Sequence, residues 1–450
     1  MAGLAGLRCG NYGRRVVSRN PEEASWEKRS VSGCVGLKGG PQLLPYAFAA
    51  IVFDGYDVIV YGSAVPALLK FRDWDLTPGE VGAIGSYALL GMFVGALAAG
   101  VLGDLIGRRR MIIGCVSWFS AAMLLVAMAP NPELLGLSRF IAGLGFGGVI
   151  PATIALIIEC APTRRRNLNT ALALIGFPVG GILAAVLAIA LLKDHGFRIL
   201  FAFGGLPLVT LVPLLVILLP ESPAYLANRA ARTELRARRA EQADKARPGV
   251  RLSGRNAVAA VLLACATYCS LLLVYALNTW LPQIMRSAGY ELGPALAFLL
   301  VLNVGAIVGG VTGSLIADRV GNRRVSTTAF LIATACIALL GLPLPSVALF
   351  ILVGLTGAVT VGAQIMMFGY VGTYFPSDIR ARALGFTSGV GRLGGVTGPL
   401  LGGYLAASHV SIAWNFWVFA VVAFVGAFFA FVTPRLTGDA NGEGERLGGG

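Results

Sequence analysis

The chain has 450 residues, of which 56% are hydrophobic and only 13% are charged, and its formal net charge is +14. Repeated apolar runs of about 20 residues are typical of helices that cross a membrane. The composition therefore excludes a soluble enzyme and indicates a polytopic helical membrane protein.

Twelve apolar runs follow one another along the chain, and each predicts one transmembrane helix. Their approximate ranges are 45–69, 80–103, 111–129, 133–160, 168–192, 198–219, 256–283, 293–316, 326–343, 346–373, 382–408 and 412–433. An even number of spans places both termini on the same side of the membrane. The first 44 residues are polar and basic and contain no apolar signal-peptide region, so we expect them to form a cytoplasmic tail.

The basic residues are distributed unevenly between the two sides of the predicted membrane. Of the 36 Lys and Arg residues, 29 lie in the tails and loops of one side and 5 lie on the other. Cytoplasmic loops carry the excess of Lys and Arg, so both termini are predicted to be cytoplasmic, in a multi-pass protein of the cytoplasmic (inner) membrane. Because orientation accounts for the basic charge, the lipid bilayer and not a nucleic acid is the expected partner.

The second half of the chain repeats the first at an offset of 214 residues. The recurring residues are Asp104, Gly107, Arg109 and Arg110, which reappear as Asp318, Gly321, Arg323 and Arg324. The predicted fold is all-α, with twelve transmembrane helices in two six-helix halves, 45–219 and 256–433. A cytoplasmic linker, 220–255, joins the halves, and tails 1–44 and 434–450 flank them. Parallel repeats of this kind bind substrate near the bilayer midplane, between the halves.

Two carboxylates interrupt the first predicted span. Asp54 and Asp57 lie one helical turn apart in an otherwise apolar run. A charge at the centre of a bilayer costs at least about 2.5 kcal/mol, so ionisable groups there are functional by default. Arg139 in the fourth span and Arg392 in the eleventh are the basic residues within the spans. The alternative is a static buried network that fixes helix packing.

The loop after the second span carries a recognisable motif. Gly103–Arg110 resembles the signature loop of major facilitator transporters, although Leu105 replaces its usual first Arg, and the second copy keeps that Arg as Arg319. An Asp in such a loop can pair with Arg and with a nearby helix end and so close the cytoplasmic side. The predicted cytoplasmic gate consists of Asp104, Arg108, Arg109, Glu159, Asp318, Arg319 and Arg323. The alternatives are that these Arg residues only fix orientation and that Glu159 makes a simple interfacial pair.

The box Asp54-Gly55-Tyr56-Asp57, the segment 374–382 and the Gly-rich run 389–403 around Arg392 together resemble the aromatic acid:proton symporter family. The resemblance covers the chain from about Pro41 to Pro434. It implies a secondary active transporter that imports a hydroxybenzoate-like aromatic carboxylate with protons by alternating access. It implies no enzyme activity, cofactor or metal, and we expect a monomer.

Depth in the membrane divides the buried polar groups into two sites. At a rise of ~1.5 Å per residue, Asp54, Gln364 and Arg392 lie about 13–15 Å from the cytoplasmic boundary. On the same scale Asp57 lies at about 18 Å and Arg139 at about 21 Å. We predict that Asp57, Arg139 and Asp54 couple protons, because burial favours a neutral carboxyl group and a nearby Arg favours the charged one.

The substrate-binding residues are predicted to be Arg392, Gln364 and Asp54. A fixed cation at Arg392 would offset the cost of a buried substrate carboxylate. A boundary error of three residues would exchange the roles of Asp54 and Asp57, so which of them carries the proton stays open.

Several aromatic residues lie in the spans and could stack on an aryl ring, although such residues more often serve plain packing or an interface belt: Tyr56, Tyr61, Tyr87, Tyr268 and Tyr275. Two other functions remain as alternatives. One is a proton-coupled symporter of another small organic acid or a sugar, and the other is a proton-driven drug exporter.

Overall fold

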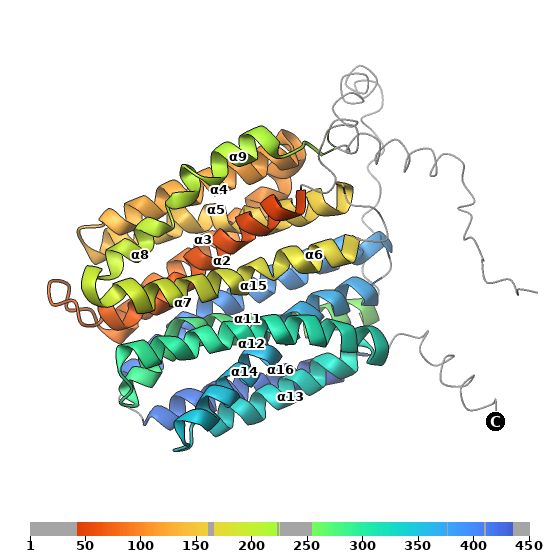
Figure 1. The fold of residues 1–450 in the computed structure, drawn as a ribbon. Helices are drawn as coiled ribbons and strands as arrows, with labels where there is room; N and C mark the ends of the chain where they lie inside the picture. The colour runs from red at the N-terminus through yellow and green to blue at the C-terminus, as the bar shows by residue number, and fades with distance from the viewer. Residues whose placement is uncertain are drawn as a thin grey trace, which may run out of the picture.

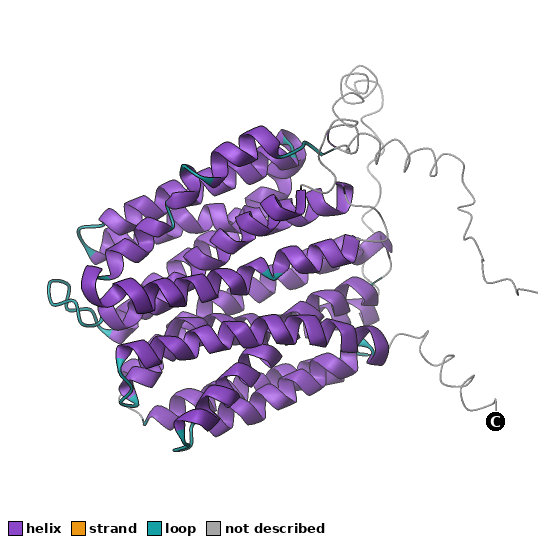
Figure 2. Ribbon diagram, viewed as in Figure 1, coloured by secondary structure: helices purple, strands orange, loops and turns teal. Residues whose placement is uncertain are grey.

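The computed structural model describes residues 43–160, 166–222, 225, 254–375, 377–408 and 411–434. Within these residues every regular element is a helix (Figure 2). The first half consists of α2 (Leu43–Leu68), α3 (Pro78–Ile106), α4 (Arg108–Met128), α5 (Pro132–Cys160), α6 (Arg166–Leu174), α7 (Gly176–His195), α8 (Phe197–Phe203), η2 (Leu206–Leu208) and α9 (Leu211–Leu218). The second half consists of α11 (Gly254–Ser287), α12 (Leu292–Val320), α13 (Asn322–Leu340), α14 (Ser346–Tyr374), α15 (Ser377–Ala407) and α16 (Ile412–Val432).

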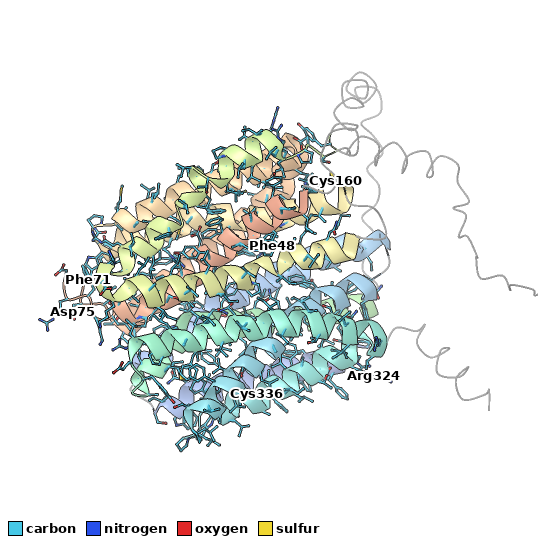
Figure 3. The ribbon with its side chains drawn as sticks, in the orientation of Figure 1. Phe48, Phe71, Asp75, Cys160, Arg324 and Cys336 are labelled. Carbon is cyan, nitrogen blue, oxygen red and sulfur yellow. The ribbon has the colours of Figure 1, made fainter. Side chains whose placement is uncertain are left out.

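The long helices run side by side, so the loops gather at two opposite ends of the bundle (Figure 1). One end holds loop 69–77 and is called the loop end. The other holds Arg108–Arg110 and Arg324 and is called the basic end. Figure 3 labels Phe71 and Asp75 at the loop end and Arg324 at the basic end.

Eleven of the described helical segments are long and apolar enough to cross a membrane. The remaining long helix, α15, has 31 residues but carries Arg382, Arg392 and many Gly residues, which lower its hydropathy. Because α15 packs against α11 and α3 inside the bundle, it completes the set of twelve spans, as the eleventh in chain order. The prediction of twelve spans in two repeated halves is confirmed.

The structure divides two predicted spans that hydropathy alone treats as continuous. The fifth consists of α6 and α7, which meet at Ile175. The sixth consists of α8, the short η2 and α9, with its break between Phe203 and Leu211. Pro207 lies in this break, where it supplies no amide hydrogen for a helical bond.

Glycine residues let the helices of each half approach closely. A Cβ atom at Gly55 of α2 would overlap the carbonyl oxygen of Phe177 in α7. A Cβ atom at Gly143 of α5 would lie 2.9 Å from the Cα of Gly91 in α3. Small residues at helix contacts are the usual means of close packing in membranes, where lipid removes most of the hydrophobic driving force.

The two halves meet at the loop end. The Ser86 hydroxyl of α3 donates to the Val396 carbonyl of α15 at 2.7 Å. A Cβ atom at Gly82 would lie 2.7 Å from the Pro399 oxygen and 3.1 Å from the Gly403 Cα. These residues lie in the first part of α3 and the last part of α15, which both adjoin the loop end, so the halves are closed against each other there.

Candidate functional site

Asp54 and Asp57 of α2 are both fully buried, with 0% of their surface exposed. None of their four carboxyl oxygens has a hydrogen-bond partner among the described residues. Buried polar groups are normally paired, so two orphaned carboxyl groups in one helix are unusual. Such groups are suited to bind a proton or to respond to an arriving charge.

The residues between the two carboxyl groups serve other helices. Gly55 faces α7, where its missing side chain leaves room for the Phe177 carbonyl. The Tyr56 hydroxyl donates to the Leu200 carbonyl of α8 at 2.7 Å. The spacing of three residues places Asp54 and Asp57 on neighbouring positions of one helix face. In this box Gly55 and Tyr56 therefore serve the packing of α2 against α7 and α8, and Asp54 and Asp57 supply its ionisable groups.

Arg139 of α5 lies next to Asp57 but does not hydrogen-bond to its carboxyl group. Its Nη1 donates to the Asp57 backbone carbonyl at 3.2 Å, and its guanidinium carbon lies 4.5 Å from the centre of the Tyr61 ring. The Tyr61 hydroxyl in turn donates to the Val81 carbonyl of α3 at 2.5 Å. The Arg139 guanidinium and the Asp57 carboxyl group lie within electrostatic reach of each other, so we treat the two as one electrostatic group.

Arg392 forms a second group with residues from both halves. Its charge interacts with Asp54 of α2 and with Tyr275 of α11. The Tyr275 hydroxyl lies 3.8 Å from the Met92 sulfur of α3, and the Tyr275 ring lies over Gly395, one turn beyond Arg392. Tyr275 therefore spans the interface between the halves, beside a half-buried cation and a buried carboxyl group.

Gln364 is the predicted substrate residue that the structure does not join to the others. It is half-buried on α14 and makes no hydrogen bond to a described residue.

At the basic end, Glu159 lies 3.7 Å from the Arg108 Nε and accepts a hydrogen bond from the Ser222 hydroxyl. Glu221 accepts from the backbone amides of Arg109 and Ser222, each at 3.0 Å. The start of the linker is thus hydrogen-bonded to the first turn of α4 and to the end of α5. Sequence reasoning assigned Glu221 and Ser222 only to the linker 220–255 and did not predict these contacts.

The structure describes only some of the predicted gate residues of the second half. The Arg323 guanidinium donates to the Phe431 carbonyl of α16 and lies 5.5 Å from that residue's ring centre. Arg319 is exposed at the end of α12. The side chains of the predicted gate residues Asp104 and Asp318 lie outside the described part of the structure.

Comparison with known proteins identifies the family. The sequence profile of the Major Facilitator Superfamily matches residues 47–347 and 303–448. The chain is 36% identical to a gentisate transporter of Corynebacterium glutamicum, over 90% of each chain. It is 33% identical to a benzoate transport protein of Acinetobacter baylyi, over 85% of this chain and 87% of that one.

A solved structure supports the same fold. The inward-open xylose transporter XylE of Escherichia coli aligns with 90% of this chain and 98% of its own, with a TM-score of 0.70 and 18% identity. The relatives are transport proteins and not enzymes. The chain therefore belongs to the Major Facilitator Superfamily and, within it, to the family of the aromatic acid transporters.

Proposed function

We propose that this protein imports an aromatic carboxylate of the hydroxybenzoate type together with protons, by alternating access. The observation that carries the proposal is that the buried Asp54 of the first half lies within electrostatic reach of Arg392 of the second, beside Tyr275, which spans the interface. A site between the halves is exposed to each side in turn when the halves rock. The gentisate and benzoate transporters among the relatives support an aromatic acid as the substrate.

In the proposed mechanism Arg392 receives the carboxylate of the substrate. A guanidinium group binds a carboxylate through two parallel hydrogen bonds, and the charge pair lowers the cost of burying the anion. Asp54 must be neutral when the substrate arrives, because a second anion beside Arg392 would compete with it. Tyr275 lies within electrostatic reach of both Arg392 and Asp54, so we assign it the contact with the substrate ring.

Proton coupling is assigned to Asp57 and Arg139, with Asp54 as the link to the substrate. A proton on Asp57 removes the attraction of its carboxylate for Arg139, which then remains held by the Tyr61 ring and the Asp57 backbone. Loss of the proton restores the attraction. Gain and loss of this proton therefore give the first half two arrangements, which differ in the position of the Asp57 carboxyl group.

We further propose that the protein resides in the cytoplasmic (inner) membrane as a monomer, with both termini and the basic end in the cytoplasm. The excess of Lys and Arg at the basic end supports this orientation. The present structure is then closed toward the outside. In the opposite state, Asp104, Arg108, Arg109, Glu159, Asp318, Arg319 and Arg323 close the cytoplasmic side.

The test is uptake of labelled gentisate, benzoate and 4-hydroxybenzoate into proteoliposomes with an imposed proton gradient. We expect accumulation of at least one acid, and its loss when a protonophore is added. No uptake of any aromatic acid, or uptake that ignores the gradient, would contradict the proposal. Sugar uptake that survives Arg392→Ala would favour the sugar-symporter alternative instead.

A further inference from the structure

The break in the sixth span lies directly beside Asp57. In an unbroken helix the Gly204 amide would bond to the Leu200 carbonyl, four residues back. Here it bonds to the Phe201 carbonyl at 3.0 Å, and Pro207 cannot bond to the Phe203 carbonyl because it has no amide hydrogen. The break therefore releases backbone carbonyl groups of α8 from their helical partners.

One of these released carbonyl groups is bonded by the Asp54–Asp57 box of α2. The Leu200 carbonyl accepts its hydrogen bond from the Tyr56 hydroxyl at 2.7 Å. A buried carbonyl without a donor would be costly, so Tyr56 stabilises the broken form of the span. Tyr56, which directly precedes Asp57, therefore stabilises the break that faces the Asp57 side chain.

The Asp57 carboxyl group occupies the space where a side chain at position 204 would lie. A Cβ atom at Gly204 would overlap the Asp57 Oδ1 and lie 3.0 Å from its Cγ and 2.9 Å from the Met123 Cε. The space bounded by Gly204 and Met123 is called the Asp57 seat. Gly204 has φ −64° and ψ −18°, values that any residue adopts. The glycine is therefore required by the approach of the carboxyl group and not by the backbone conformation.

The seat is apolar. The charged or titratable groups that interact with Asp57 are Asp54 and Tyr56 of its own helix and Arg139 of α5. Met123 of α4 and Gly204 offer no charge, and no described residue donates a hydrogen bond to the carboxyl oxygens. A charged carboxylate without donors is costly in such surroundings, so the seat favours the neutral form.

We infer that Gly204 is a positioning residue that holds the Asp57 carboxyl group in its proton-bearing position. The carboxyl group leaves the seat toward Arg139 when it loses its proton. The broken span is thereby part of the proton-coupling machinery, although it contributes no ionisable group. This inference rests on the proton coupling proposed above and adds the residue that determines its pH dependence.

The chain supplies a matched control at the next position. Gly205 is also buried and has φ −81° and ψ −13°, but a Cβ atom there would meet the Leu124 side chain. Leu124 is 37% exposed and has room to move aside. Gly204→Ala and Gly205→Ala therefore add the same methyl group to the same break, and only the first displaces the carboxyl group.

The experiment compares the wild type with both variants in proteoliposomes over a range of pH. In Gly204→Ala we expect proton-driven uptake to fall off about one pH unit lower than in the wild type, because a carboxyl group displaced toward Arg139 loses its proton more easily. A shift of about one pH unit corresponds to a tenfold change in the ratio of the neutral form to the charged form. Substrate exchange, which moves no net protons, should be unchanged. Gly205→Ala should match the wild type in both measurements.

The outcomes separate the two proposals. Wild-type protein without proton-driven uptake would overturn the proposed function. A proton-driven wild type whose pH profile is shared by both variants would overturn the inference about Gly204 alone. A second measurement needs no Gly204 variant. The infrared carbonyl band that disappears in Asp57→Asn should have the position of a carboxyl group without hydrogen bonds, and the position of a hydrogen-bonded group would also overturn the inference.

Discussion

The Arg139 guanidinium lies over the Tyr61 ring, 4.5 Å from its centre, and donates to the backbone of Asp57 and not to its carboxyl group. A buried Arg held by a ring and a carbonyl keeps its place whether or not the neighbouring carboxyl group carries a proton. The Tyr61 hydroxyl extends the contact to α3, the helix that closes against the second half at the loop end. This chain of contacts joins the candidate proton site to the closure between the halves.

Arg139→Lys should abolish substrate accumulation and lower thermal stability. A lysine keeps the charge but loses the planar stacking and the fork of donors. A desolvated contact between a guanidinium group and an aromatic ring is worth about 2 kcal/mol, so weakening the contact with Tyr61 should lower stability by up to that amount. Thermal unfolding in detergent and uptake assays check the prediction. Arg198→Lys is the control, since Arg198 donates to the Ala129 carbonyl near the loop end and should tolerate the change. Equal behaviour of the two variants would contradict the role given to Arg139.

Asp57→Asn should remove proton coupling and retain substrate exchange. The amide resembles the protonated carboxyl group in size and stays neutral at every pH, so the variant is fixed in one form. Accumulation should be lost while exchange of labelled for unlabelled acid continues. Asp54→Asn should impair both measurements, because Asp54 also interacts with Arg392. Normal accumulation in both variants would remove these residues from the mechanism.

Arg392→Gln should raise the KM for the aromatic acid at least about tenfold, which corresponds to ~1.4 kcal/mol of lost binding. Glutamine can still donate a hydrogen bond but cannot neutralise the carboxylate. Arg392→Lys keeps the charge and should raise the KM less. Initial uptake rates over a range of substrate concentrations give the KM and the maximal rate of each variant. A changed maximal rate with an unchanged KM would argue against a direct contact with the substrate.

Gly82→Leu should stop the halves from closing at the loop end. A Cβ atom at Gly82 already lies 2.7 Å from the Pro399 oxygen, so a larger side chain holds the halves apart. Uptake should be lost, while substrate binding from the outside remains. Gly79→Leu is the control, since its Cβ would have only the Thr77 hydroxyl as a neighbour, at 4.0 Å. Wild-type uptake by Gly82→Leu would show that this contact is not needed for transport.

Hydropathy and helical rise were sufficient to predict much of the architecture. Twelve apolar runs predict twelve spans because backbone groups in lipid must bond within their own helix. The same regular rise placed Asp57 near the level of Arg139, and Asp54 near that of Arg392. The structure brings each pair within electrostatic reach. The functions of these four residues remain predictions.

Contacts that depend on the packing of distant helices were not predictable. Nothing in the sequence indicates that Tyr61 lies under Arg139, because the two are on different helices and either could face lipid. Gly204 looked like one glycine among 60. Its importance follows only from its contact with the Asp57 carboxyl group. The role of Gln364 likewise stays a prediction, since a shared depth in the membrane does not by itself place residues in one site.

Low hydropathy makes α15 a poor candidate for unaided entry into the lipid during synthesis. The translocon releases a segment into the bilayer according to its apolar character, and Arg residues near the middle oppose this release. The helices against which α15 packs, α11 and α3, leave the ribosome before it. Its glycines fit against backbone and side chains of α11, at Tyr268 and Leu272 among others. Assembly of the second half therefore depends on earlier helices receiving α15, and the segment that carries Arg392 enters the membrane with the help of its partners.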